Sequence, residues 1–319
     1  MKFITEFLNS GTVKQQNRKR LGALLICITA ALLAVALIVL AVFGIAGAIK
    51  NRGAEEEETE ETGDQIPKDY VTTEFSKDQS ANGPLLMLDA SHPYTGTATT
   101  VQPAGNLRVK TEDGSDIYKG AYGDINITQE TLDAFNAMML AFHNEQKSNS
   151  EYRVGSVWLP SLLSGLNEEI SVATKEALKS GYLLILENQY DEADPSIYDA
   201  ENKTGKGVYQ WIYQNAAKYG FIQVGDSAAE GNIFRYVGVV HATYMTDKNL
   251  SFADYITKLH TTTGIGKTLK VTAEGVKYEI FYIAPGETHI KPESYDFTVS
   301  GDNMGGYIVT VNKTAKTDK

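Results

Sequence analysis

The stretch from Trp211 to Leu259 constrains the fold of this chain more than any other, because helical and extended patterns alternate along it with clear boundaries. Apolar side chains recur at helical spacing over residues 208–219, which predicts an amphipathic helix. Gly220, which can adopt a positive φ, ends that helix. The pattern then predicts a strand at 221–224, a turn-rich loop at 225–231, a strand at 233–237 and a helix that begins at Val239.

Two motifs in this stretch carry a resemblance to a known family. The motif W-I-x-x-N-A-x-K-Y-G-F-I begins at Trp211, and E-x-x-x-F-R-Y-V-G begins at Glu230 after a loop. Together they resemble the C-terminal half of the VanY-type D-alanyl-D-alanine carboxypeptidases, which are zinc peptidases that trim the stem peptide of peptidoglycan. Residues 251–256 (S-F-A-D-Y-I) are similar to the last helix of that family. A weaker likeness extends over residues 85–186. The resemblance implies an α+β domain, with a small antiparallel sheet flanked by helices.

The catalytic motifs of the family are where this chain departs from it. The family carries S-x-H-x-x-G-x-A-x-D and then E-P-W-H before R-Y-V-G; the resemblance implies that both His and the Asp bind zinc and that the Glu is the general base. Glu230 falls on that Glu, and Ile233 falls on the second His. With Gly181 on the Gly of the first motif, Leu178 falls on its His and Ile185 on its Asp. Alkyl side chains have no lone pairs, whereas catalytic zinc needs three protein ligands. We therefore expect no metal and a vestigial Glu230.

Three further residues are candidates for binding a substrate. Arg153, in S-E-Y-R, resembles the S-G-Y-R of the family, whose Arg holds the substrate carboxylate. A second register places Leu159 there instead and suits the strand position better. Arg235 and Tyr236 are the other candidates, although an ion pair between Arg235 and Glu230 would make the role of Arg235 structural.

The remaining composition excludes several classes of function. The net charge of -11 argues against a nucleic-acid partner. Neither G-x-S-x-G nor S-x-x-K occurs, so serine peptidase chemistry has no support. The segment G-I-G-K-T at 264–268 lacks the first glycine of a phosphate loop, because Thr261 stands at that position. The five histidines form no H-E-x-x-H motif, and Cys27 is the only cysteine.

Residues 21–49 contain no charged side chain. As a helix they would span about 43 Å, which exceeds the roughly 30 Å hydrocarbon core of a bilayer. We predict a single transmembrane helix there. The basic residues 18–20 place the tail 1–20 in the cytoplasm and the main domain outside the cell. Ala46-Gly47-Ala48 has the small residues of a signal-peptide cleavage site, but the apolar run is too long for an ordinary signal peptide.

The rest of the chain is expected to form three parts. Residues 50–80, with the acidic run EEEETEETGD, are an extended extracellular linker. Residues 81–262 are the VanY-like domain, with helices at 127–143 and 166–178 and strands at 152–159 and 182–186. Residues 263–319 are a small β module. Its strands are predicted at 269–272, 277–283, 295–299 and 306–311.

These expectations lead to a functional hypothesis. The chain is predicted to be a membrane-anchored, carboxypeptidase-like protein that acts at peptidoglycan. We expect it to bind a stem peptide or a cell-envelope protein, to hydrolyse no peptide bond and to have no cofactor. One alternative is an active zinc D,D-carboxypeptidase with ligands elsewhere in the sequence. Another is a structural subunit of a membrane assembly.

Overall fold

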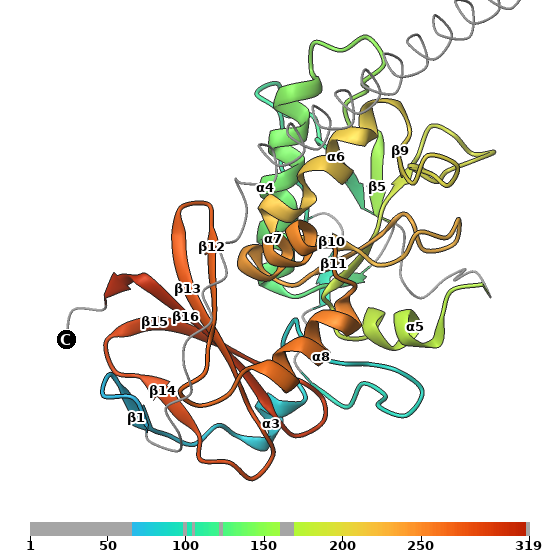
Figure 1. Cartoon of the computed structure of the whole chain (residues 1–319). Helices are drawn as coiled ribbons and strands as arrows, with labels where there is room; N and C mark the ends of the chain where they lie inside the picture. The colour runs from blue at the N-terminus through green and yellow to red at the C-terminus, as the bar shows by residue number, and fades with distance from the viewer. Residues whose placement is uncertain (1–65, 98–100, 104–105, 121–123, 160–168, 317–319) are drawn as a thin grey trace, which may run out of the picture. The chain divides into compact units, whose positions relative to one another are not determined.

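The computed structural model describes residues 66–97, 101–103, 106–120, 124–159 and 169–316. The described part is a mixed α+β structure with several small sheets (Figure 1). The predicted transmembrane helix 21–49, the tail before it and the acidic run all lie outside these residues. Within the described ranges, no helix combines the length and the apolar character needed to cross a membrane.

A three-stranded antiparallel sheet forms the centre of the predicted VanY-like domain. Its strands are β6 (Leu183–Ile185), β10 (Phe221–Gln223) and β11 (Ile233–Tyr236), and β11 lies in the middle. Side chains alternate between the two faces along each strand. The register places Ile233 opposite Ile185 and Arg235 opposite Leu183, so these four side chains share one face. The other face carries three apolar residues, Leu184, Phe221 and Phe234.

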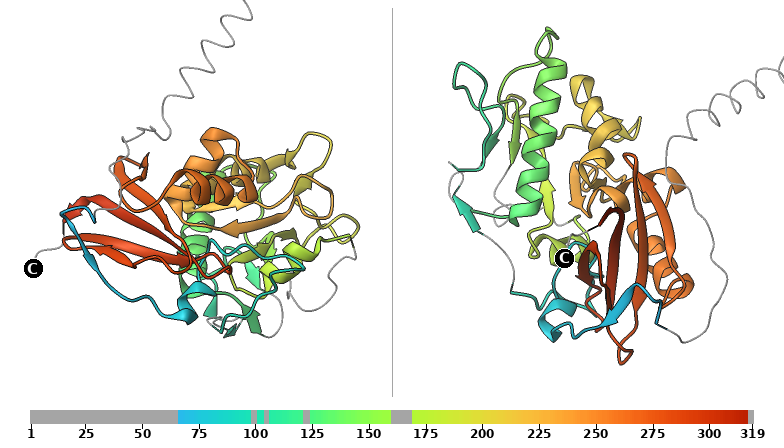
Figure 2. Two further views of the ribbon diagram at one scale, coloured as in Figure 1. Left: turned by 60° about the horizontal axis from the view of Figure 1, so that its bottom comes forward. Right: turned by 90° about the vertical axis from the view of Figure 1, so that its left-hand side faces the viewer.

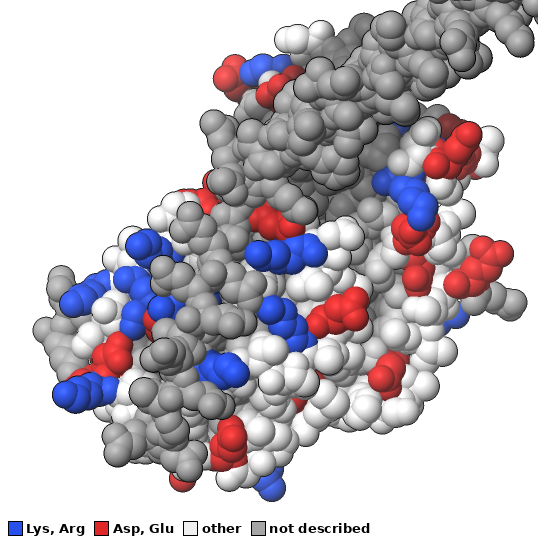
Figure 3. All heavy atoms as spheres, in the orientation of Figure 1, with Lys and Arg blue, Asp and Glu red and all other residues white. Residues whose placement is uncertain are grey.

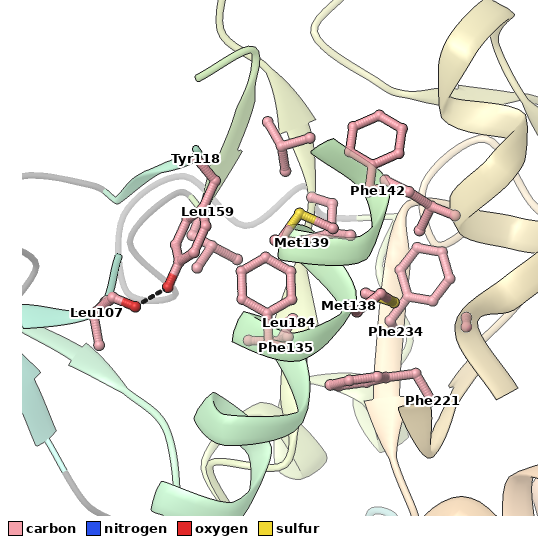
Figure 4. Packing of buried hydrophobic residues seen from close by; sticks show 14 of the residues in the cluster. Leu107, Tyr118, Phe135, Met138, Met139, Phe142, Leu159, Leu184, Phe221 and Phe234 are labelled. Carbon is pink, nitrogen blue, oxygen red and sulfur yellow. Dashed lines mark hydrogen bonds between the residues drawn. The ribbon is translucent and has the colours of Figure 1, made fainter. Parts of the chain in front are cut away.

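Helix α4 (Gln129–Gln146), which the sequence predicts at 127–143, covers the second face of this sheet. Thr128 caps it, because its side chain accepts a hydrogen bond from the backbone N–H of Thr131. The apolar side of α4 is fully buried against the sheet (Figure 4). In the same cluster, the hydroxyl of Tyr118 donates to the backbone carbonyl of Leu107. The cluster comprises chiefly Leu132, Phe135, Met138, Met139, Phe142, Leu184, Phe221 and Phe234.

The helix predicted at 208–219 is helical throughout but not continuous. It consists of the 3₁₀ turn η2 (Gly207–Tyr209), helix α6 (Gln210–Asn215) and the 3₁₀ turn η3 (Ala216–Tyr219). The side-chain amide of Asn215 donates to the carbonyl of Trp211 at 2.8 Å, where it competes with the helical hydrogen bond. Gly220 then ends the segment at φ 84°, which confirms the predicted stop.

A four-stranded antiparallel sheet forms the C-terminal part, next to the layer that contains α4 and α6 (Figure 2). It packs through one face against helices α7 (Val239–Lys248) and α8 (Phe252–Thr262). All four predicted strands are present. In spatial order they are β12 (Leu269–Ala273), β13 (Val276–Ile283), β16 (Tyr307–Lys316) and β15 (Tyr295–Gly301). Whether residues 263–319 form a separate domain stays a prediction.

Several elements differ from the expectations. The strand predicted at 152–159 is restricted to β5 (Val157–Leu159), because Gly155 at φ 74° takes the chain through a turn just before it. Helix α5 spans Val172–Leu178. The strands β1 (Tyr70–Thr72) and β14 (Ile290–Pro292) pair across more than 200 residues and were not anticipated. The other short elements are α3 (Lys77–Ser80), β2 (Val101–Pro103), β3 (Lys119–Gly120), β4 (Asp124–Asn126), β7 (Glu187–Asn188), β8 (Tyr198–Asp199) and β9 (Thr204–Gly205).

Acidic and basic side chains are interspersed on the face of the molecule shown in Figure 3. The prediction that the chain has no nucleic-acid partner rests on the net charge of the whole sequence and stays a prediction.

His241, in α7, joins that helix to its neighbours from a buried position. One ring nitrogen lies 2.6 Å from the hydroxyl of Tyr255, and the other lies 3.1 Å from that of Thr310. Burial lowers the pKa of His241 to about 3, so the ring is neutral in the folded protein at pH 7. Because the unfolded chain binds this proton near pH 6.5, the folded state loses stability as the pH falls from about 6.5 toward 3, by about 1.4 kcal/mol per pH unit.

The variant His241→Gln tests this expectation. Its free energy of unfolding is expected to be less sensitive to pH than that of the unaltered protein between pH 6.5 and 4, in chemical denaturation at several pH values. Parallel pH profiles for the two proteins would show that His241 does not account for the acid sensitivity.

Candidate functional site

A cavity of about 390 Å³ lies on the face of the three-stranded sheet that α4 does not cover. Its walls come from β6, β10 and β11, from α5, from residues 87–89 and from the start of α8. Apolar side chains dominate the lining, which also contains three charged side chains, those of Asp89, Glu230 and Arg235. The remaining lining residues are Met87, Leu88, Ser171, Ala173, Thr174, Ala177, Leu183, Ile222, Val224, Ser251, Phe252 and Ala253.

Glu230 is held in place by the start of α5. Its Oε1 accepts a hydrogen bond from the backbone N–H of Ser171 at 2.9 Å and another from the hydroxyl of Thr174 at 2.7 Å. Burial would raise the pKa of Glu230, but the hydrogen bonds from Thr174 and Ser171 outweigh it and hold the pKa below its ordinary value. The group is therefore a carboxylate at neutral pH, and it is a poorer base than a free glutamate.

The three residues predicted to stand at the zinc-ligand positions lie in one cluster. Ile185 and Ile233 are direct partners across β6 and β11. Leu178, at the end of α5, belongs to the same buried cluster. All three side chains are less than a tenth exposed. They pack beside the cavity and do not line it. An all-alkyl set of this kind does not fit zinc, which needs nitrogen, oxygen or sulfur donors.

Arg235 lines the cavity, but its guanidinium bonds to backbone and not to Glu230. Nε and Nη2 donate to the carbonyl of Pro84 at 3.2 and 3.0 Å, and Nη2 also donates to the carbonyl of Leu86 at 2.7 Å. The guanidinium carbon stacks 3.6 Å from the centre of the Phe252 ring. Burial lowers the pKa of Arg235 to about 9. The expected ion pair with Glu230 is absent from the described residues, because these carbonyls satisfy the guanidinium instead.

The other candidate substrate-binding residues lie elsewhere. Arg153 is exposed on the turn before β5, where its guanidinium lies 5.5 Å from the ring centre of Tyr190. Leu159, the second register for that position, is buried in the core that α4 covers. Tyr236 packs edge-on against Phe221. None of the three lines the cavity around Glu230. Their assignment as substrate-binding residues stays a prediction.

The residues that follow Glu230 have structural reasons for differing from the family pattern. At Gly231, any side chain would meet the ring of Tyr198 at 2.0 Å, so only glycine fits. Asn232 donates from its side chain to the carbonyl of Leu186 at 3.1 Å and so ties β11 to the end of β6. Ser171 and Thr174 were not identified from the sequence, although their spacing is that of a helix cap.

No group of three or more His, Cys, Asp and Glu side chains in the described ranges lies close enough together to hold a metal ion. His241 is enclosed by Tyr255 and Thr310, which engage both of its ring nitrogens. His92 lies 3.1 Å from Asp89 at a half-exposed position near the cavity. The structure therefore assembles no alternative ligand set around Glu230 from the residues that it describes.

No family model matches the chain. Over 112 residues, the sequence is 36% identical to a D-alanyl-D-alanine carboxypeptidase of Enterococcus faecium. That match covers 32% of this chain, and the chain spans about a third (36%) of the length of that protein. The solved structure of the vancomycin-resistance D,D-dipeptidase VanXYg, in complex with a D-Ala-D-Ala phosphinate analogue, superposes with a TM-score of 0.56 and 18% identity. It covers 76% of this chain and 99% of VanXYg.

The chain is VanY-like. The sequence match shows the relationship over a third of the chain, and the superposition shows that the VanY-like protein has the fold of such peptidases over three quarters of it. A further VanY-like structure, VanYB in complex with D-alanine-D-alanine, aligns with a TM-score of 0.31 and 13% identity over 55% of this chain and 97% of VanYB.

Proposed function

We propose that this VanY-like protein binds a peptidoglycan stem peptide without hydrolysing it. The observation that supports the proposal most is the alkyl cluster of Leu178, Ile185 and Ile233 beside the cavity. At the positions that the motif alignment assigns to the zinc ligands, this chain has alkyl side chains packed in a hydrophobic core. Without the metal there is neither an activated water nor a Lewis acid for the scissile carbonyl.

Glu230 does not replace the missing metal. A general base needs a pKa near the working pH, whereas the hydrogen bonds from Thr174 and Ser171 shift the pKa of Glu230 the other way. In this position Glu230 is an acceptor for an N–H group of a bound ligand. It also joins the loop before β11 to the start of α5 through its hydrogen bonds to Ser171 and Thr174.

The ligand class follows from the cavity and from the relatives. A volume of about 390 Å³ with mostly apolar walls and a few polar groups is typical of small-molecule sites. The solved VanXYg structure contains a D-Ala-D-Ala analogue. Two methyl groups and a peptide unit match such walls, so we propose the D-Ala-D-Ala end of a stem peptide as the ligand. A cell-envelope protein is the alternative occupant.

The variant Ala173→Trp tests where the ligand binds. Ala173 is exposed on α5 and lines the cavity, so a tryptophan there fills the space without disturbing the core. We expect it to raise the Kd for a peptide that ends in D-Ala-D-Ala by at least about tenfold in calorimetric titration of the full chain. Val172→Trp is the matched control, because Val172 is 54% exposed and does not line the cavity.

Three results would count against the proposal. Equal binding by both variants would place the ligand elsewhere, and no binding by the unaltered chain would remove the stem peptide as ligand. Hydrolysis of the peptide during the titration would favour the alternative of an active zinc D,D-carboxypeptidase.

We also propose that residues 21–49 anchor the protein in the cell membrane as a single helix, with residues 1–20 in the cytoplasm and the described domain outside. The support is the uncharged run and the basic residues before it. We expect the chain to stay in the membrane fraction when membranes are washed at alkaline pH. We also expect protease added outside intact cells to digest the main domain. Release by the wash would exclude the anchor.

A further inference from the structure

A second cavity, separate from the one that Glu230 lines, has a volume of about 650 Å³. It lies between the C-terminal sheet and the segment where β11 leads into α7. The floor comes from β13, β15 and β16, and the opposite wall comes from Tyr182, from residues 236–241 and from the first turn of α4. The full lining comprises Gly83, Pro84, Leu85, Glu130, Tyr182, Tyr236, Val237, Gly238, Val239, Val240, His241, Tyr278, Asp296, Phe297, Thr298, Val299, Ser300, Ile308, Thr310 and Asn312.

The charges on this wall are of one sign. Glu130 and Asp296 are exposed carboxylates at its rim, and neither Lys nor Arg is among the lining residues in the described part of the chain. His241 is the only other titratable base there, and it is buried and neutral at pH 7. Two carboxylates with no Lys or Arg among the described lining residues produce a negative potential, which attracts a cation and repels an anion.

Three tyrosine rings line the same cavity as these carboxylates. Tyr182, Tyr236 and Tyr278 all line the cavity, and they come from three different strand regions. Burial raises the pKa of Tyr182, and the interaction of its hydroxyl with the Glu130 carboxylate raises this pKa further. The faces of tyrosine rings attract cations, and recognition of ammonium groups by several aromatic rings with nearby carboxylates is a recurrent arrangement.

Hydrogen-bonding groups on the same wall remain available. The hydroxyls of Tyr236 and Tyr278 and the side chains of Thr298 and Asp296 have no hydrogen-bond partner in the described part of the chain. The three donors of an ammonium group can use such acceptors in several directions. An anionic ligand would gain no attraction from these carboxylates.

We propose that this cavity binds a ligand through a primary alkylammonium group, such as the side-chain amine of a peptide or the amine of an amino sugar. The ammonium lies among the three tyrosines, with Glu130 and Asp296 at the rim as its counter-ions. The site does not depend on the cavity around Glu230. A chain can therefore hold one ligand at each site, and the two sites can be tested apart.

Four probes test whether binding requires a free amine and whether the amine of a peptide side chain or that of an amino sugar binds. Nuclear magnetic resonance titration of the full chain would use Nα-acetyl-lysine methylamide and its Nε-acetylated form, and then glucosamine and N-acetylglucosamine. We expect one or both free amines to shift signals of the cavity residues, and the acetylated partner of each binding amine not to do so. Binding of an acetylated probe as tightly as its amine, or no binding by either amine, would overturn the proposal.

Two variants place the probe in the cavity. Asp296→Asn and Tyr278→Leu are each expected to raise the Kd of the binding amine about fivefold. Glu112→Gln is the matched control for the loss of one exposed carboxylate, and we expect no change of Kd from it. Ala173→Trp, which fills the other cavity, is also expected to leave the amine Kd unchanged. Equal effects of Asp296→Asn and Glu112→Gln on the Kd would show that the amine binds through general surface charge, which would contradict the proposed site.

Discussion

Replacing Ile185 by Asp is expected to lower the free energy of unfolding by about 3–5 kcal/mol at pH 7. Ile185 is 8% exposed, and it lies opposite Ile233 within the cluster that includes Leu178. None of these neighbours donates a hydrogen bond from its side chain, so a carboxylate would be buried without a partner. Urea denaturation followed by circular dichroism measures the effect.

The pH dependence of this variant gives a second test. Burial in an apolar cluster raises the pKa of a carboxyl above its unfolded value of about 3.9. The folded state then prefers the neutral form, so the penalty is small below that value and grows as the pH rises through it. Ile185→Val is the control and is expected to cost only about 0.5–1.5 kcal/mol at any pH. An aspartate tolerated at pH 7, or stabilised by zinc, would mean that the surroundings of residue 185 are polar.

The second large effect is expected from Arg235→Met, which should destabilise the protein by about 3–4 kcal/mol. The substitution leaves the carbonyls of Pro84 and Leu86 without donors and removes the stacking on Phe252. Pro84 lines the second cavity, and Leu86 directly precedes residues 87–89, which line the first. The variant is therefore also expected to loosen this segment, which hydrogen exchange measures.

Arg153→Met is the matched control for the loss of an arginine. Arg153 is exposed, and its recorded contact is the ring of Tyr190, so its removal is expected to change stability by no more than about 0.5 kcal/mol. Two results would contradict the roles assigned to the two arginines. These are loss of peptide binding in Arg153→Met and an unchanged free energy of unfolding in Arg235→Met.

The sequence predicts the elements whose pattern is long and local. Helix α4 follows from its 3.6-residue periodicity and its Thr128 cap, and the four C-terminal strands follow from alternation and glycine turns. The pairing of β1 with β14 joins residues far apart in the chain, so no local pattern encodes it. The helix changes from α to 3₁₀ after Asn215, and the periodicity of the apolar residues does not indicate this change.

The candidate site was predictable only in part. Alignment to the family motif brought out Glu230, and the strand register shows that Ile185 and Ile233 face each other. The anchoring of Glu230 by Ser171 and Thr174 was missed, because contact across 56 residues or more is set by packing. The predicted ion pair between Arg235 and Glu230 was wrong for a related reason. Arg235 bonds to backbone carbonyls of a distant segment, and no sequence pattern predicts such a contact.

The predicted absence of hydrolysis is tested most directly by release of D-alanine. Purified full-length protein, supplied with zinc, would be incubated with a peptide that ends in D-Ala-D-Ala, and free D-alanine would be measured over time. With alkyl side chains at 178, 185 and 233, we expect no release above that of a protein-free control. A steady release that a chelator stops and added zinc restores would contradict this prediction.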